Sequence, residues 1–213
     1  KKVYLQHKFA KSNSDHALIE LFPIPCSNLP SWNYSELSNQ IHYFETKEKY
    51  RNYVVDLRIK KIINWGQECQ KFKNTKENLH NAIKLIREIR PCIVITHSNH
   101  EKHRDHKNLS NLIVEATWKA SEDIMPKLGT CYKVKDVWAF EVVDPLDRVD
   151  FCVDISNYID TKIKAMKIYE SQENVVSGII EYIDGISKVR GYEIGVKHAE
   201  AFKRINCQPR EIF

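Results

Sequence analysis

Four of the nine histidines of the chain lie within ten residues. They are His97, His100, His103 and His106, with the carboxylates Glu101 and Asp105 among them. Neutral imidazole is a common metal ligand, and near neutral pH it also serves as an acid or a base. His103 and His106 are three residues apart, so at the start of a helix they would face the same side. The stretch therefore predicts a metal or acid–base site, with a solvated histidine-rich loop as the alternative. We interpret His97 and His100 as surface or supporting groups.

An apolar run directly precedes this stretch. Residues 92–95, Cys-Ile-Val-Ile, show no polar alternation, which is typical of a strand buried on both faces of a parallel sheet. After the histidines, apolar residues recur at helical spacing, at Leu109, Leu112, Ile113, Ala116 and Ala120. Ligands of open α/β sheets bind at the carboxyl ends of the strands. The histidine loop is therefore predicted to join a buried strand to a helix at the ligand-binding edge of a sheet.

Predicted strands and helices alternate along the rest of the chain. We expect strands at residues 16–24, 59–65, 131–143 and 151–155. We expect helices at residues 3–11, 35–53, 74–90, 156–169, 175–189 and 199–202, and Asn74 with Glu77 is expected to cap the third of these. The alternation predicts an α/β fold, a three-layer sandwich with a Rossmann-like, mostly parallel sheet. No internal repeat or low-complexity linker is found, so residues 1–213 are expected to form a single domain.

The composition favours a soluble, cytoplasmic protein. The chain has 213 residues, 42% of them hydrophobic, and its net charge of +5 is spread without a basic run, so nucleic-acid binding is not indicated. Its six cysteines form no CxxC pair, which fits a reducing compartment, with disulfides as the alternative because the count is even. No stretch approaches the roughly 18 apolar residues of a membrane span, and residues 1–9 lack the apolar core of a signal peptide. We therefore expect no nucleic-acid or membrane partner, and a homo-oligomer is left open.

Several separate segments together resemble one known family. Residues 93–96 end a predicted strand, and residues 103–106, His-Arg-Asp-His, close the next loop at the start of a helix. This arrangement resembles the second metal motif, His-x-Asp-His, of the LmbE-like or PIG-L-type zinc-dependent de-N-acetylases. The closing pattern of that family is matched in order and spacing by residues 151–156, Lys162, Ala165, residues 169–172, residues 190–191, Gly195 and residues 199–202. The resemblance covers roughly residues 16–205.

The resemblance implies roles for the residues of the second motif. His106 would be a zinc ligand, and His103 would stabilise the oxyanion or protonate the leaving amine. Asp105 would orient one of these two rings. An amide is a poor electrophile, so zinc would activate water and polarise the carbonyl. The implied activity is hydrolysis of an N-acetyl group from a sugar or sugar conjugate.

The first motif of the family, His-Pro-Asp-Asp, is not found in this sequence. In the family it follows the first strand and supplies the other zinc ligands and the Asp general base. Residues 4–14 align with the helix that normally comes next, so the chain is expected to lack the first strand and the first metal motif. A look-alike at residues 13–16, Asn-Ser-Asp-His, precedes a predicted strand and would lie at the amino end of the sheet. A catalytic zinc ordinarily has three protein ligands, so the zinc expectation depends on residues upstream of Lys1.

Two further residues are candidates for substrate contact. Glu141 follows a predicted strand and is a candidate to contact a sugar hydroxyl, with a solvated strand-end carboxylate as the alternative. Arg190 is a candidate to bind an anionic group, with a role in tying down the C-terminal helix as the alternative.

Two other functions compete with a deacetylase. One is a catalytically inactive binding module of the same fold that has lost the metal site. The other is an unrelated Rossmann-like nucleotide binder, which is disfavoured because no Gly-x-Gly-x-x-Gly follows a strand.

Overall fold

The computed structural model describes residues 2–6, 18–23, 62–63, 65, 70–142, 144–167 and 177–205, and gives side chains from residue 65 onward. The chain forms two compact units. The first comprises Lys1–Ile24, Lys60–Val153 and Ala201–Phe213, and the second comprises Pro25–Ile59 and Asp154–Glu200. The expectation that residues 1–213 form a single domain stays a prediction.

The described strands form one sheet in the order β3-β1-β2-β4-β5-β7-β6. Their bounds are β1 (Lys2–Gln6), β2 (Leu18–Pro23), β3 (Ile62–Ile63), β4 (Ile93–His97), β5 (Asp136–Phe140), β6 (Phe151–Asp154) and β7 (Ala199–Arg204). The central strands β2, β4 and β5 run parallel, and β4 pairs with its neighbours through Ile19↔Val94 and Val94↔Val137. The pairs β1–β2, β1–β3 and β5–β7 are antiparallel. The α/β class is confirmed. The sheet is less parallel than expected, because only β2, β4 and β5 run parallel and the outer pairs β1–β2, β1–β3 and β5–β7 are antiparallel.

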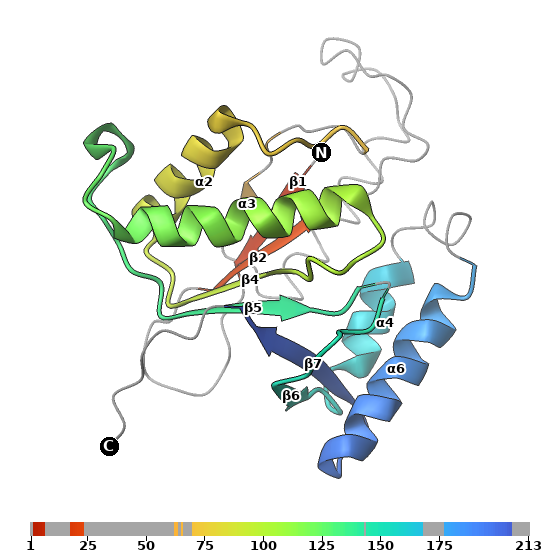
Figure 1. Ribbon diagram of the computed structural model, residues 1–213. Helices are drawn as coiled ribbons and strands as arrows, with labels where there is room; N and C mark the ends of the chain where they lie inside the picture. The colour runs from red at the N-terminus through yellow and green to blue at the C-terminus, as the bar shows by residue number, and fades with distance from the viewer. Residues whose placement is uncertain are drawn as a thin grey trace, which may run out of the picture. The chain divides into compact units, whose positions relative to one another are not determined.

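Two helices pack on the central strands of the first unit. Figure 1 shows α2 (Lys76–Ile89) and α3 (Arg104–Ser121) side by side, and a short 3₁₀ helix, η2 (Pro126–Leu128), follows α3. The apolar stripes of both helices meet Val94 of β4 and Val137 of β5 in one core. The fully buried members contributed by the two helices include Ala82, Ile83, Leu109, Leu112 and Ala116. The helical periodicity at residues 74–90 and after the histidines therefore predicted both helices correctly.

Three local predictions are wrong. Residues 2–6 form strand β1 rather than the start of a helix at residues 3–11, because they pair with β2 on one side and β3 on the other. Residues 199–204 form strand β7 rather than a final helix, because they pair with β5. Such pairings override local periodicity. The cap of α2 is Thr75, whose hydroxyl accepts from the Asn78 backbone N–H at 3.2 Å, rather than Asn74.

The first of these corrections affects the family alignment. The alignment matches residues 4–14 with the helix that follows the first motif of the family. That match fails for the described residues 4–6, which form a strand. The helix expected at residues 35–53 and the look-alike motif at residues 13–16 lie outside the described residues.

A buried arginine fixes α2 against the far end of α3. Arg87 is 4% exposed, and its guanidinium donates to six backbone carbonyl oxygens at distances of 2.8–3.2 Å. The acceptors belong to Lys119, Ala120, Glu122, Ile124, Met125 and Gly129. The last carbonyls of a helix lack intrahelical partners and carry partial negative charge, so a cation is stabilising there. Arg87 thereby satisfies the carboxyl end of α3 and the turn that follows it.

In the second unit, α4 (Ile159–Lys167) packs against α6 (Ile179–Ile194) through Ile155, Ile159 and Ile183. Among the described residues, none of the helices has both the length and the apolar composition of a membrane span. The chain turns sharply where α6 ends, with Gly195 in the left-handed region at φ 74° and the Val196 N–H donating to the Gly191 carbonyl at 2.9 Å. A Cβ on Gly191 would lie 2.7 Å from the carbonyl oxygens of Val196 and Lys197. This close approach requires glycine at position 191.

We expect Arg87→Ala to lower the free energy of unfolding by about 3 kcal/mol or more, because each buried carbonyl left without a donor costs roughly 1–3 kcal/mol. Arg87→Lys, with three donors and no planar guanidinium, should lower the free energy of unfolding by a smaller amount than Arg87→Ala. Urea denaturation followed by circular dichroism measures both, and Lys84→Ala on the exposed face of the same helix is the matched control. Equal stability of the Arg87→Ala and Lys84→Ala variants would contradict this role.

Gly191→Ala should lower the melting temperature because the new methyl group meets backbone, at a cost of about 1–3 kcal/mol. Gly185→Ala, on the same helix with nothing within 4 Å of the added Cβ, is the control. It should be neutral or stabilising by up to about 1 kcal/mol through helix propensity. Thermal unfolding of the two variants side by side tests the contrast, and similar melting temperatures would show that the contact at position 191 is unimportant.

Candidate functional site

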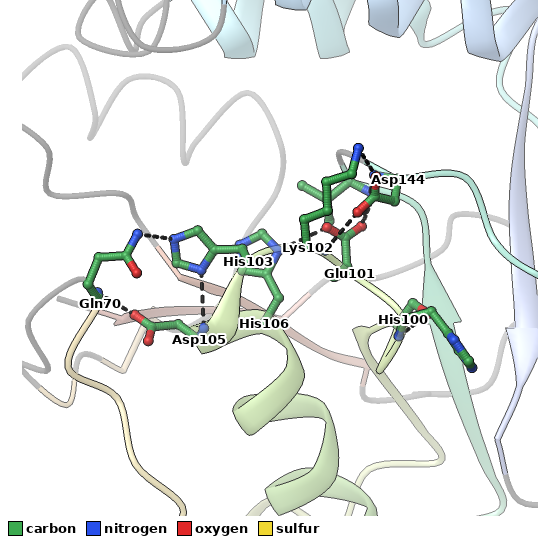
Figure 2. Close-up of polar contacts among 10 residues, drawn as sticks. Gln70, His100, Glu101, Lys102, His103, Asp105, His106 and Asp144 are labelled. Atoms are coloured by element: carbon green, nitrogen blue, oxygen red, sulfur yellow. Dashed lines mark hydrogen bonds and ion pairs between the residues drawn. The ribbon is translucent and has the colours of Figure 1, made fainter.

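The histidine-rich stretch lies where sequence reasoning placed it. Strand β4 ends at His97, residues 98–102 form a loop, and His103 is the N-cap of α3. Figure 2 shows His103, Asp105 and His106 at the start of α3, with Glu101 and Lys102 beside Asp144 and with His100 set apart from them. The amino end of a helix carries partial positive charge and backbone N–H groups without intrahelical partners. The site therefore combines imidazoles with a helix terminus that favours developing negative charge.

Three of the four imidazoles lie close to one another. The ring centroids of His97 and His106 are 4.3 Å apart, and those of His103 and His106 are 4.6 Å apart. His97 is 0% exposed, so of the two roles considered for it the supporting one fits and the surface one does not. The side chain of His100 is 56% exposed and pairs with Asp147 at 3.4 Å. His97, His103 and His106 are thus brought together, and His100 is turned toward a surface carboxylate.

The carboxylate beside His106 is Glu101. Glu101 is 0% exposed, and its Oε2 lies 3.4 Å from Nδ1 of His106. Its Oε1 accepts from the backbone N–H of Val142 at 3.1 Å and of Asp144 at 3.4 Å. A buried charge needs such partners, because burying it without them is costly. The two oxygens of Glu101 therefore have different partners, backbone on one side and an imidazole on the other.

Asp105, expected to orient a ring, holds a neighbouring segment with its carboxylate. Its Oδ2 accepts from the backbone N–H of Gln70 at 2.7 Å, and the residue is 2% exposed. Its link to an imidazole is through the backbone, since the Asp105 N–H donates to Nδ1 of His103 at 3.2 Å. Gln70 has the left-handed φ of 65°, which is uncommon outside glycine. Asp105 thereby fastens this strained residue to the start of α3.

His103 is set up as a neutral ring that carries its proton on Nε2. Its Nδ1 accepts from the Asp105 N–H, so the proton of the neutral ring lies on Nε2. Burial, together with the nearby His106, lowers the pKa of His103 below the ordinary histidine value. Nε2 lies 3.2 Å from the side-chain nitrogen of Gln70. Rotation of that amide by half a turn would present its oxygen to the Nε2–H instead.

A second loop holds the histidine loop in place. Asp144 accepts from the Lys102 backbone N–H at 2.7 Å and pairs with the Lys102 ammonium at 2.8 Å, which lowers the pKa of Asp144. Glu141 accepts from the Leu146 backbone N–H at 2.9 Å and so closes its own loop. The contacts of Asp144 and those of Glu101 thus join residues 101–102 to Val142 and Asp144, in the loop between β5 and β6.

The other sequence-based candidate lies in the second unit. Arg190 is on α6, and its guanidinium pairs with Glu193 at 2.8 Å. Sequence reasoning did not find the roles of Glu101 and Gln70. The position of Glu101 among the histidines was the one available signal for it, and the sequence offers none for Gln70.

A cavity of about 720 Å³ lies in the first unit beside the histidine loop. Its lining includes Ser110 and Trp118 of α3, Asp136 of β5 and Lys203 of β7. Asn99 lines it from the histidine loop, whereas none of the imidazoles does. The imidazoles at the start of α3 therefore lie outside this cavity.

The donor set gives part of a metal site. The Nδ1 of His106 faces Glu101, and metal-binding histidines usually direct their other ring nitrogen to a carboxylate or carbonyl in this way. His106 therefore fits a single ligand position through Nε2. Within the described ranges no group of three or more His, Cys, Asp or Glu side chains is arranged to hold an ion. A complete three-ligand site consequently does not fit within the part of the chain described here.

Comparison with known proteins shows which family this chain resembles. Residues 24–117 match the family model described as PIG-L, GlcNAc-PI de-N-acetylase. That segment contains β4, the histidine loop and most of α3. The resemblance of the chain to the LmbE-like, PIG-L-type family is confirmed.

Solved structures share the fold. The conserved protein TT1542 from Thermus thermophilus has a TM-score of 0.70 at 22% identity, over 84% of this chain and 82% of that chain. The N,N'-diacetylchitobiose deacetylase from Pyrococcus horikoshii has a TM-score of 0.62 at 20% identity, over 79% and 67%. The 4-carboxy-2-hydroxymuconate hydratase GalB from Pseudomonas putida has a TM-score of 0.59 at 18% identity, over 86% and 82%. A deacetylase and a hydratase thus share this architecture, so the reaction must be argued from the site.

In protein without added metal, His103 should titrate below the ordinary histidine value of about 6.5. Since the unfolded chain then binds more protons than the native state between the two pKa values, stability should fall as pH drops through that window. The assigned ring resonance of His103 in an NMR titration measures the pKa, and its loss in His103→Gln confirms the assignment. The same variant should show a smaller loss of stability between neutral and acidic pH. A pKa at or above the ordinary value would contradict the neutral ring.

Proposed function

We propose that the chain is a zinc-dependent de-N-acetylase that acts on an N-acetylated sugar or sugar conjugate. The observation that carries this proposal is the pair of imidazoles on the first turn of α3, with His106 backed by Glu101 and His103 held by a backbone N–H. The match of residues 24–117 to a de-N-acetylase family supports it. The similarity in fold to a chitobiose deacetylase fits an N-acetylated amino sugar.

Each imidazole has its own task in amide hydrolysis. His106 would hold the zinc ion through Nε2, and the remaining ligands would have to come from outside the described residues. When bound, the ion supplies activation of water and polarisation of the acetamide carbonyl. The Nε2–H of His103 donates a hydrogen bond to the oxygen on which negative charge develops.

The remaining candidates have supporting places in this proposal. Asp105 acts on His103 through its backbone N–H and on Gln70 through its carboxylate. Glu141 and Arg190 stay candidates for contact with the sugar, although each already has a partner, Leu146 and Glu193 respectively.

The test is acetate release from N,N'-diacetylchitobiose and from an N-acetylglucosamine conjugate by the protein supplied with Zn²⁺. His103→Gln should lower kcat by about 10²–10³-fold, the usual cost of one oxyanion donor. His106→Ala should abolish release, and a chelator should do so reversibly. His100→Ala is the matched control, because that exposed ring pairs with a surface carboxylate, and it should keep full activity.

Two outcomes would overturn the proposal. Acetate release that withstands the chelator and both histidine substitutions would place the chemistry elsewhere. Protein that neither binds Zn²⁺ nor releases acetate, yet binds the N-acetylated sugar, would support an inactive binding module of the same fold.

A further inference from the structure

We infer that Glu101 is the positioning residue of His106: it holds the neutral ring in the tautomer that carries its proton on Nδ1, so that the Nε2 lone pair faces the site. As a ligand-positioning role, this deepens the proposed function and rests on it. The assignment differs from the one the sequence suggested, in which Asp105 would orient a ring.

The contacts of Glu101 fix which of its oxygens meets His106. Oε1 accepts two backbone N–H groups, those of Val142 and Asp144, at 3.1 Å and 3.4 Å. A backbone N–H only donates, so this end of the side chain must be an acceptor. The other oxygen, Oε2, is thereby directed at Nδ1 of His106, 3.4 Å away. An ionised carboxylate only accepts, so Nδ1 must be the nitrogen that carries the proton.

Because both groups are buried, the contact between Glu101 and His106 decides which tautomer the ring adopts. Glu101 is 0% exposed and His106 is 6% exposed, so bulk water competes little for either group. The rings of His97 and His103, with centroids 4.3 Å and 4.6 Å from that of His106, flank it and restrict its rotation. A ring held in place beside a carboxylate has one favourable tautomer. The Nε2 lone pair is then ready for an ion without a proton transfer.

The second loop takes part in this arrangement. The two N–H groups that orient Glu101 belong to residues 142 and 144, and the Asp144 carboxylate in turn accepts from the Lys102 N–H beside Glu101. Segments about 40 residues apart in sequence therefore cooperate to set the tautomer of one imidazole.

Glu101→Gln tests the inference with little change in shape. The amide oxygen must stay with the Val142 and Asp144 N–H groups, so the amide NH₂ is turned toward Nδ1 of His106. Because that group only donates, Nδ1 has to accept, and the proton moves to Nε2. The variant should therefore fold normally and yet carry the opposite tautomer of His106.

The measurement is NMR of the metal-free protein with ¹⁵N-labelled histidine, in which the nitrogen shifts of His106 identify its tautomer. We expect Nδ1–H in the original protein and Nε2–H in Glu101→Gln. Glu115→Gln, the same change at a carboxylate of α3 that pairs with Lys119 at 3.9 Å, is the matched control and should keep Nδ1–H. Zn²⁺ affinity by titration should fall by about 10–100-fold in Glu101→Gln and stay unchanged in Glu115→Gln.

The outcomes separate this inference from the proposed function. Nε2–H in the original protein, or the same tautomer in the original protein and a folded Glu101→Gln variant, would overturn the role of Glu101 even if acetate is released. The expected tautomers without acetate release would support the role of Glu101 and count against the deacetylase. If Glu101→Gln fails to fold, judged by circular dichroism, the tautomer of the original protein alone decides the inference.

Discussion

The site depends on the position of one helix, and a buried guanidinium holds that helix at its far end. Arg87 of α2 reaches six carbonyl oxygens at and beyond the carboxyl end of α3. The apolar stripes of α2 and α3 fix the helices side by side, but apolar contact alone permits sliding along the axis. Directional hydrogen bonds oppose such sliding. Since His103 and His106 are on the first turn of α3, any shift of the helix would move both rings relative to the end of β4.

The other end of α3 is held by short polar contacts with the surrounding loops. Asp105 takes the Gln70 N–H, and the Asn108 side chain donates to the Phe72 carbonyl at 2.9 Å. Residues 70–72 lie just before α2. They hydrogen-bond to the amino end of α3, and Arg87 of α2 hydrogen-bonds to its carboxyl end, so both ends of α3 are fixed. This arrangement explains why the carboxylate of Asp105, inside the histidine motif, accepts a hydrogen bond from the backbone of Gln70. The accurate placement of an imidazole requires that its own backbone be fixed first.

The parts of this structure that could be predicted are those determined by a local pattern of apolar residues in the sequence. The apolar run at residues 92–95, the histidine loop and the stripe from Leu109 to Ala120 are continuous in sequence, and β4, the loop and α3 follow from them. The strands β1 and β7 could not be found in this way, because their conformation is decided by partners far away in the sequence. The roles of Glu101 and Gln70 are hidden for the same reason. The backbone hydrogen-bond partners of Glu101 lie 41 and 43 positions away in the sequence, and the partners of Gln70 lie 33 and 35 positions away.

The environment can give opposite roles to two imidazoles on the same turn of a helix. His103 receives a backbone N–H at Nδ1, which leaves Nε2–H as a donor. His106 faces a carboxylate at Nδ1, which leaves Nε2 as a lone pair. Amide hydrolysis at a metal needs one group of each kind, a lone pair for the ion and a donor for the oxygen that becomes negative. The sequence supplies two identical side chains, and a backbone N–H and a buried carboxylate distinguish them.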